Sequence, residues 1–434
     1  MKNIIYILSF LGTLSSVHAQ ESVLISKEEV LTKVRENNNT IKISQQNVLA
    51  AKGDYNQSNA VILPNISVSH TAISTTNPLM AFGSKLNQEI LTQADFNPLL
   101  LNNPSQIQDY ATRIVVQQPL VNLDGIYQRM AAKAKLNAIE LKADRTNDYI
   151  DLEVEKTYMQ LQLAYKSVTV LEQAKKAAME NRRLADNSFK QGYLQKSDVL
   201  AVAVRLTEIE NQLQYAQSNV HNVSNYLSVL MNDDNYGLLR PTDSLTLMVS
   251  DIFTEGLPEN RKDVQAMTLS TEAYQQMHRA DKMSFLPSLN AFGTYELHDD
   301  EIFQGDANGY LIGAELKWNI FEGSKRFGKA QKSRAEYEKS KLELHQYKAE
   351  SQVELNRAMR LLQDAKNNLE LTSLAMQQSE ESLRIRTNRF EQGLEKTSDL
   401  LNAETQFSQK KLEYYTTIYN YNYALAYVKY LTKE

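Results

Sequence analysis

The sequence predicts a mainly α-helical protein that contributes four β-strands to a barrel shared between copies and that is built as an internal duplication. Three observations predict this fold: an internal repeat, very long helical segments without Gly or Pro, and short segments of alternating hydrophobic and polar residues. The chain has 434 residues, of which 42% are hydrophobic and 23% are charged, and no apolar run approaches the roughly 20 residues of a membrane-spanning helix. The net charge of -5 argues against a nucleic-acid partner, and the absence of Cys excludes disulfides and thiolate metal sites.

The N-terminal residues 1–19 have the pattern of a secretory signal peptide. Lys2 supplies the positive charge, an apolar stretch runs from Ile4 to Leu14, and small residues at Val17 and Ala19 form a cleavage site. The alternative is a buried N-terminal strand or helix. The apolar stretch is too short to span a bilayer, so the pattern favours a cleaved signal and an exported protein.

The chain repeats itself. Residues 185–231 align with residues 386–432 at a constant offset of 201, and Leu63-Pro64 matches Leu286-Pro287 at an offset of 223. The two offsets differ by 22, which indicates an insertion of about that size in the first half, between the two matched blocks. Since solenoid repeats run only about 20–50 residues, this is a tandem duplication of one long unit. We therefore expect a first structural repeat over 20–231, a connector over 232–261 that is rich in Gly and Pro, and a second repeat over 262–434.

Each repeat is expected to contain the same elements in the same order. A helical segment comes first, then a β-hairpin, then two long helices joined by a turn that contains Gly. The expected ranges are helix about 26–62, hairpin about 65–121 and long helices about 123–231 in the first repeat, and about 262–284, 288–321 and 323–432 in the second.

The long helices cannot belong to a compact globule. Neither Gly nor Pro occurs between Gly125 and Gly192, and roughly 60 helical residues would extend about 90 Å. In the last helix a hydrophobic residue recurs every seven positions, which is typical of a coiled-coil seam. The residues of this seam are Phe407, Tyr414, Tyr421 and Val428. Such helices must pack side by side as a rod or a tube.

The alternating segments predict strands with one apolar face. Period-two alternation over about ten residues is what a transmembrane β-strand requires, although a half-buried sheet in water would alternate similarly. The secretory signal and the aromatic residues Trp318 and Phe321 at one strand end, where a membrane interface would lie, favour the membrane. The apolar positions of the last strand are Tyr310, Ile312, Ala314, Leu316, Trp318 and Ile320.

Four strands cannot close a barrel alone. Open strand edges are not tolerated in lipid, and known barrels start at about eight strands. Other copies of the chain must therefore complete the barrel. The strand number leaves both a dimer and a trimer open.

Several sequence blocks, in order along nearly the whole mature chain, carry a family resemblance. They are Ile62–Ser67, Phe82–Leu86, Gln93–Phe96, Gln118-Pro119-Leu120, Asn260–Val264, and the two Phe-x-Gln-Gly turns that are each followed by Ser-Asp-x-Leu. With this ordered and duplicated set, the chain resembles the TolC-like outer membrane efflux protein family. The resemblance implies a homotrimer with a 12-stranded β-barrel in outer membrane lipid and a trimeric α-helical barrel that forms a tunnel through the periplasm. It also implies a periplasmic adaptor (membrane fusion) protein and an inner-membrane pump as partners, in a tripartite efflux or type I secretion system.

Two aspartates follow the turn glycines at the start of each returning helix. Ser197-Asp198 and Ser398-Asp399 are expected to cap these helices and to complement their dipoles. The resemblance additionally places Asp399 at the narrow periplasmic end of the tunnel, in a ring of three carboxylates that favours cations. Asp198, Asn402 and Glu395 are the other expected gate residues. Asn402 replaces the acid of a second ring, and Glu395 stands where relatives have a basic residue.

The two turns themselves are expected to be the adaptor-docking tips. Gly192 and Gly393 are the turn residues that tolerate positive φ, and Ser197 and Ser398 lie beside them. At the other end, the inserted segment from Asn77 to Asp109 is expected to form an extracellular loop. Its fold, whether disordered or folded over the channel mouth, stays open.

No constellation of catalytic or metal-ligating residues appears, and no cofactor is expected. The His residues are scattered, and His298 beside Asp299, Asp300 and Glu301 is interpreted as part of a solvated loop tip. The sequence therefore favours a passive outer membrane export channel. A periplasmic coiled-coil adaptor or structural protein is the alternative, but it would not need alternating strands. A periplasmic enzyme lacks an acid–base or metal cluster.

Overall fold

The computed structural model describes residues 22–234, 237–248 and 256–434. The expected signal peptide and parts of the connector lie outside these residues. The described helices are α1 (Lys27–Asn37), α2 (Asn39–Gln57), α3 (Pro78–Asn87), α4 (Pro98–Asn102), α5 (Leu123–Lys190), α6 (Lys196–Met231), α7 (Lys262–Met283), α8 (Lys325–Glu391) and α9 (Thr397–Leu431), with the 3-10 turns η1 (Ser58–Val61) and η2 (Gln93–Phe96). The strands are β1 (Val23–Ile25), β2 (Asn65–Thr75), β3 (Ile107–Val121), β4 (Leu239–Pro241), β5 (Ser288–Asp299) and β6 (Ala307–Lys317).

The chain divides into two compact units, and neither unit coincides with one sequence repeat. Unit 1 combines residues up to 43 with 145–258 and 351–434, and unit 2 combines 44–144 with 259–350. Each unit therefore contains segments of both repeats. The reason is that the long helices run through both units and pair with helices of the other repeat, so the repeats are units of sequence and not of packing.

Unit 1 is a bundle built from the α5–α6 and α8–α9 hairpins and α1. Its largest core joins Val30 of α1, Val154 and Leu161 of α5, and Leu227 of α6, all of which are buried. The short strands β1 and β4 pair in parallel beside this core, so the N-terminal segment is held by the connector. The α9 seam is buried at Val428, and Ile418 and Leu425 of the adjacent row are buried with it.

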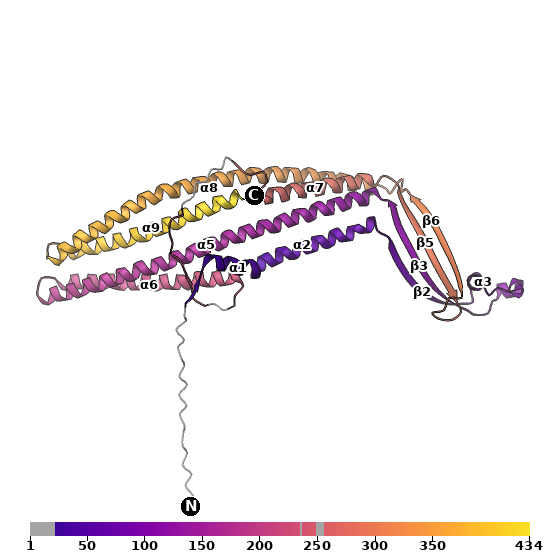
Figure 1. Ribbon diagram of the computed structural model, residues 1–434, viewed down its shortest axis with the longest axis horizontal. Coiled ribbons are helices and arrows are strands. Elements are labelled where there is room, and N and C mark those ends of the chain that lie inside the picture. The colour runs from indigo at the N-terminus through magenta and orange to yellow at the C-terminus, as the bar shows by residue number, and fades with distance from the viewer. Residues whose placement is uncertain (1–21, 235–236, 249–255) are drawn as a thin grey trace, which may run out of the picture. The chain divides into compact units, whose positions relative to one another are not determined.

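Unit 2 contains the helix segments that flank a four-stranded antiparallel sheet. The sheet has the order β2-β3-β5-β6, so each repeat supplies one hairpin and β3 pairs with β5 between the repeats (Figure 1). Arg129 of α5 donates hydrogen bonds to Asn59 and Tyr55, at 2.9 and 2.7 Å, and these bonds hold the start of α5 against α2 and η1. Within the described residues β2 and β6 are both edge strands without a second neighbour.

The strand register separates the sheet into an apolar face and a polar face. The pairs Ile66↔Val116, Gly293↔Ile312 and Tyr295↔Tyr310 share one face because side chains alternate along each strand. The polar face carries Ser69 paired with Arg113, and Arg113 makes a 2.6 Å ion pair with Glu296. Most of the apolar side chains are exposed in one copy of the chain, including Ile66, Val68, Tyr310, Ile312 and Leu316.

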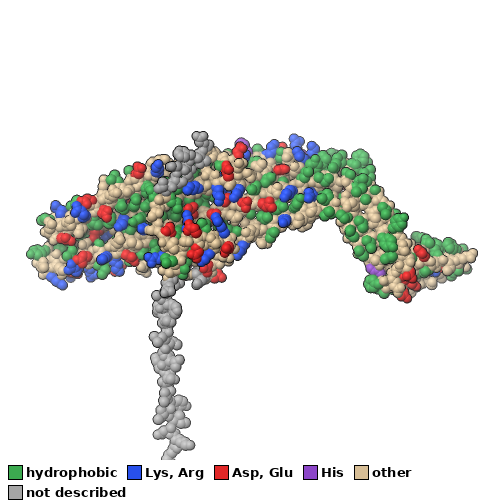
Figure 2. Space-filling model, in the orientation of Figure 1, with side chains coloured by type: hydrophobic (Ala, Val, Ile, Leu, Met, Phe, Trp, Pro, Cys, Tyr) green, Lys and Arg blue, Asp and Glu red, His purple; other side chains and the backbone are tan. Residues whose placement is uncertain are grey.

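The surface composition follows this division. Figure 2 shows hydrophobic side chains gathered over the strands, whereas Lys, Arg, Asp and Glu side chains are concentrated over the helices. No helix in the described part of the chain combines the length and the hydrophobicity needed to cross a bilayer.

Candidate functional site

The two helix–helix turns have similar backbone geometry. Gly192 has a φ of 82° and Gly393 a φ of 70°, which is the left-handed conformation that glycine adopts at a helix C-terminus. The N–H of Gly192 donates to the carbonyl of Phe189, and the N–H of Gly393 donates to the carbonyl of Phe390, each at 2.9 Å. The recurring Phe-x-Gln-Gly motif thus encodes a glycine-terminated helix in both repeats.

The aspartates that follow these turns lie at equivalent positions in their helices. Asp198 accepts a 3.0 Å hydrogen bond from the N–H of Gln195, the residue that precedes α6. Asp399 is the third residue of α9, and Lys396 precedes that helix. Both carboxylates therefore stand near the positive end of a helix dipole. The cap positions are occupied by Gln195 and Lys396, while Ser197 and Ser398 are each the second helical residue.

Glu395 is held by two arginines of its own hairpin. Its carboxylate lies 2.6 Å from Arg386 and 2.8 Å from Arg389, both on α8, and its side chain is only 10% exposed. These two arginines were missed by the sequence analysis, although their positions on one helix face before an acidic turn residue are a readable signal. Asn402, by contrast, is exposed one turn into α9.

A buried carboxylate lies further along α9. Glu404 is 6% exposed, and one of its oxygens accepts a hydrogen bond from Asn181 of α5 while the other has no partner. Burial raises the pKa of Glu404 to about 7, against the opposing effects of Arg205 of α6 and of the Asn181 amide. Glu404 also borders a cavity of about 90 Å³ that is lined by α5, α6, α8 and α9. Nothing in the sequence pattern had singled out this residue.

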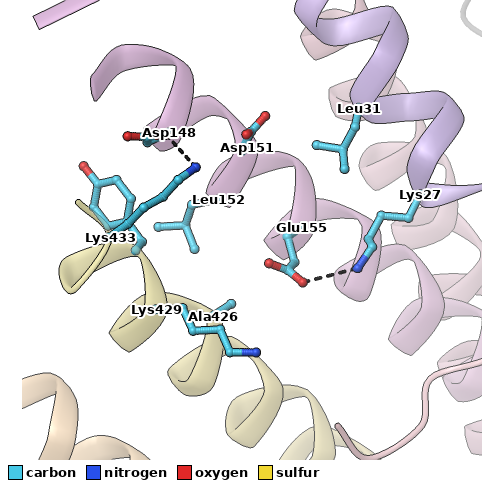
Figure 3. A pocket seen from close by; sticks show the side chains of 10 residues that line it. Lys27, Leu31, Asp148, Asp151, Leu152, Glu155, Ala426, Lys429 and Lys433 are labelled. Carbon is cyan, nitrogen blue, oxygen red and sulfur yellow. Dashed lines mark hydrogen bonds and ion pairs between the residues drawn. The ribbon is translucent and has the colours of Figure 1, made fainter. Parts of the chain in front are cut away.

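A hollow of about 250 Å³ lies between α1, α5 and α9 (Figure 3). Lys27 forms an ion pair with Glu155 at 3.4 Å, and Lys433 forms one with Asp148 at 2.6 Å. The apolar side chain of Leu152 also lines the hollow. These two ion pairs connect α1 and the residues just after α9 to α5. The hollow therefore resembles a packing feature of the bundle and not a catalytic cleft.

The aromatic residues expected at the membrane interface lie just after β6. Trp318 is 58% exposed, and its indole N–H donates a 3.0 Å hydrogen bond to the carbonyl of Phe285. Phe321 is also exposed. An amphipathic Trp with its polar atom satisfied by the backbone is suited to an interface between lipid and water.

His298 corrects one expectation. It is not in a solvated loop tip but near the end of β5, where it is buried and lies 3.1 Å from the carboxylate of Asp109. Asp109 was expected to end the extracellular loop, but it belongs to β3. Among the described residues no group of three or more His, Asp or Glu side chains is arranged to hold a metal ion.

Comparison with protein families identifies the second half of the chain. Residues 256–431 match the family described as outer membrane efflux protein. No curated protein sequence is significantly similar to the chain.

Solved structures share the fold over nearly the whole chain. A membrane protein from Pseudomonas aeruginosa has a TM-score of 0.82 at 15% identity, covering 94% of this chain and 93% of that one. The outer membrane protein VceC from Vibrio cholerae has a TM-score of 0.80 at 16% identity, with 94% and 96% covered. The CmeC outer membrane channel of Campylobacter jejuni has a TM-score of 0.77 at 16% identity, with 100% and 93% covered.

These findings confirm the family resemblance and the fold class. The structural likenesses show the fold, and the family match carries the functional class, an outer membrane efflux channel, together with the outer membrane location. The matched family is one of channels rather than of enzymes.

Proposed function

We propose that this chain, whose second half is an outer membrane efflux protein domain, forms a homotrimeric passive export duct. The observation that carries the proposal is the four-stranded sheet with two open edges, one apolar face and one polar face. In lipid, the open edges of β2 and β6 must pair with other copies, because unpaired backbone groups cost several kcal/mol each in hydrocarbon.

Three copies give a closed barrel of sufficient size. With four strands per chain, three copies supply 12 strands, the number that the family resemblance implies. The apolar face would then contact lipid and the polar face would line a water-filled lumen. The long polar helices that continue from the strands would form the periplasmic tunnel.

The helix turns are the proposed contact with the other components of the duct. Gly192 and Gly393, with Ser197 and Ser398 near them, form two tips of similar backbone geometry. We propose that they dock a periplasmic adaptor protein that connects the duct to an inner-membrane pump. The energy for export would come from that pump, since the duct itself performs no reaction.

Asp399 is the proposed gate residue. A ring of three Asp399 carboxylates at the narrow end would attract cations and hold multivalent ions. Glu395 is proposed to act indirectly, because its carboxylate is engaged by Arg386 and Arg389 and braces the turn that positions Asp399. Asp198 and exposed Asn402 are proposed to line the same end with weaker effects.

The test is to extract the protein from outer membranes with detergent and to record currents in planar lipid bilayers. We expect discrete conductance steps that multivalent cations block. Asp399→Ala should raise the single-channel conductance or weaken the block, because it removes the charged ring. Recovery of the protein without detergent would overturn the channel and favour a periplasmic adaptor instead.

Asp198→Ala is the comparison variant for the gate. It removes the equivalent helix-terminal carboxylate but keeps the Asp399 ring, and Asp198 is proposed to line the same end with a weaker effect, so its conductance and cation block should change less than those of Asp399→Ala. A change in Asp198→Ala as large as that in Asp399→Ala would reject Asp399 as the principal gate residue.

A further inference from the structure

The segment between β2 and β3 is a folded insertion. It contains α3, η2 and α4, and the ring of Phe82 packs edge-on against the ring of Phe96 with centroids 5.7 Å apart. Lys85 pairs with Asp95 at 2.7 Å, which joins α3 to η2. The insertion therefore has a defined shape, fixed by one aromatic contact and one ion pair.

The insertion is anchored to the end of the sheet by buried polar contacts. Ser84 and Gln88 of α3 each donate a 3.2 Å hydrogen bond to the carboxylate of Asp109 in β3. Gln88 also donates to the backbone carbonyls of Gln108, at 2.7 Å, and Asp299, at 3.3 Å. The Ser84, Gln88 and Asp109 side chains are all buried, so this contact fixes where α3 meets the sheet.

The anchor lies on the polar face of the sheet. Asp109 and Arg113 are four residues apart in β3, so their side chains point to the same face, and His298, which lies 3.1 Å from Asp109, is on that face too. Arg113 pairs there with Glu296. The polar face is the one that lines the lumen in a closed barrel. The insertion is therefore attached on the lumen side of the barrel rim and not on the lipid side.

The insertion exposes several large apolar side chains although it lies on the wet side. Its charged residues are Lys85, Glu89 and Asp95, and the first and the last of these pair with each other. The side chains of Leu79 and Leu99 are 82% and 80% exposed. Further exposed apolar side chains of the insertion are Met80, Leu86, Ile90, Phe96 and Leu100.

The geometry points to a second copy of this chain as the partner of this surface. On the proposed function, copies surround a common lumen and each carries its insertion on the lumen side, so these apolar surfaces face one another across the mouth. The insertions of the three copies pack together through Leu79, Leu99 and their apolar neighbours and form an extracellular cap. Lipid is excluded as the partner because the anchor is on the polar face.

The test is cross-linking between copies in the assembled channel. The chain has no Cys, so Leu99→Cys introduces a single thiol per copy. With a short bis-maleimide, we expect covalently joined copies from the intact channel. The matched control is Phe303→Cys in the β5–β6 turn, because Phe303 stacks on His70, with centroids 4.6 Å apart, and His70 is on the apolar face with Thr112. This control should not cross-link.

Conductance supplies a second, independent measurement. A cap of apolar side chains excludes water, so the double variant Leu79→Ser with Leu99→Ser should raise the single-channel conductance by about twofold or more. Cross-linked Leu99→Cys channels should conduct less than the same channels before cross-linking. Conducting trimers that neither cross-link at position 99 nor respond to the double variant would overturn the cap and leave the proposed function intact. Failure to form any oligomeric channel would overturn both.

Discussion

The two helix–helix turns have similar backbone geometry but differ in individual side chains. Glu395 corresponds to Leu194 at the repeat offset, and its partners Arg386 and Arg389 correspond to Ala185 and Ser188. The first turn therefore lacks the residues that form these ion pairs, whereas the ion pairs hold the second turn. The glycine and aspartate positions could be predicted from the sequence because they recur. The ion pairs of Glu395 with Arg386 and Arg389 could not be predicted from the repeat, because only the second repeat has these residues.

We predict that Glu395→Gln loosens the second turn. The side chain is mostly shielded, and charge-assisted hydrogen bonds contribute about 1.5–3 kcal/mol each before any discount for the half-exposed arginines. The amide N–H groups from Gly393 to Thr397 should then exchange with solvent deuterium about tenfold faster or more. Hydrogen exchange read by mass spectrometry measures this.

Glu391→Gln is the control for this prediction, since Glu391 is an exposed residue at the end of α8. It changes the same net charge near the same turn and should leave the exchange unchanged. Equal protection in wild type and Glu395→Gln would show that the two ion pairs do not hold the turn.

At the scale of elements, the sequence predicted the type of secondary structure that each segment forms. It predicted less well which other segments each element contacts. Periodicity predicted the long helices and alternation predicted the two hairpins, since both patterns are local. Alternation does not define where a strand stops. Trp318 continues the pattern of β6 but lies beyond its end, and Asp109 was assigned to a loop although it pairs within β3.

Contacts between helices that are distant in the sequence could not be predicted from the sequence. Asn181 and Glu404 are 223 residues apart, and they meet only because the α5–α6 hairpin packs against α9. Neither residue has an unusual sequence neighbourhood. Burial of Glu404 therefore became visible only with the packing of the bundle.

Glu404 predicts a pH dependence of stability. Its pKa rises from 4.5 to about 7 in the folded chain, so between these values the unfolded chain releases a proton that the folded chain keeps. The free energy of unfolding should therefore fall as pH rises through this window, by at most about 3 kcal/mol. Glu404→Gln cannot ionise and should flatten this part of the profile.

Thermal unfolding of the detergent-extracted protein from pH 4.5 to pH 8 measures the effect. The control is Glu413→Gln, which removes an exposed carboxylate from the same helix. If wild type and Glu404→Gln lose stability in parallel as pH rises, the buried carboxylate is not the source of the dependence.

At the scale of the whole molecule, the duplication explains the sheet but not the compact units. Each repeat supplies one hairpin, and the β3–β5 pairing joins them into one four-stranded sheet. The sheet remains incomplete, with β2 and β6 as open edges among the described residues. Average composition alone does not reveal the apolar face of the sheet, because only a small part of the chain carries it. The need for other copies followed from the strand number, and their number from the family resemblance.

The two faces of β6 give the last prediction. Ile312 and Leu311 are adjacent and both exposed in one copy, but they lie on opposite faces: Ile312 on the apolar face with Tyr310, and Leu311 on the polar face. On the proposed function, Ile312→Arg would place a charge in lipid, at a cost of about 2–4 kcal/mol per copy near the bilayer centre, and each copy of the proposed trimer would carry this cost. Leu311→Arg would place the same charge in the water-filled lumen at little cost.

We therefore expect Ile312→Arg to lose the heat-modifiable oligomer in detergent extracts and to reduce the amount of protein recovered in outer membranes. Leu311→Arg should keep both, and its channels should conduct cations less well because the lumen gains positive charge. Because the variants differ only in the face that carries the arginine, general effects of the substitution cancel between them. Equal assembly of the two would show that the apolar face of the sheet does not contact lipid.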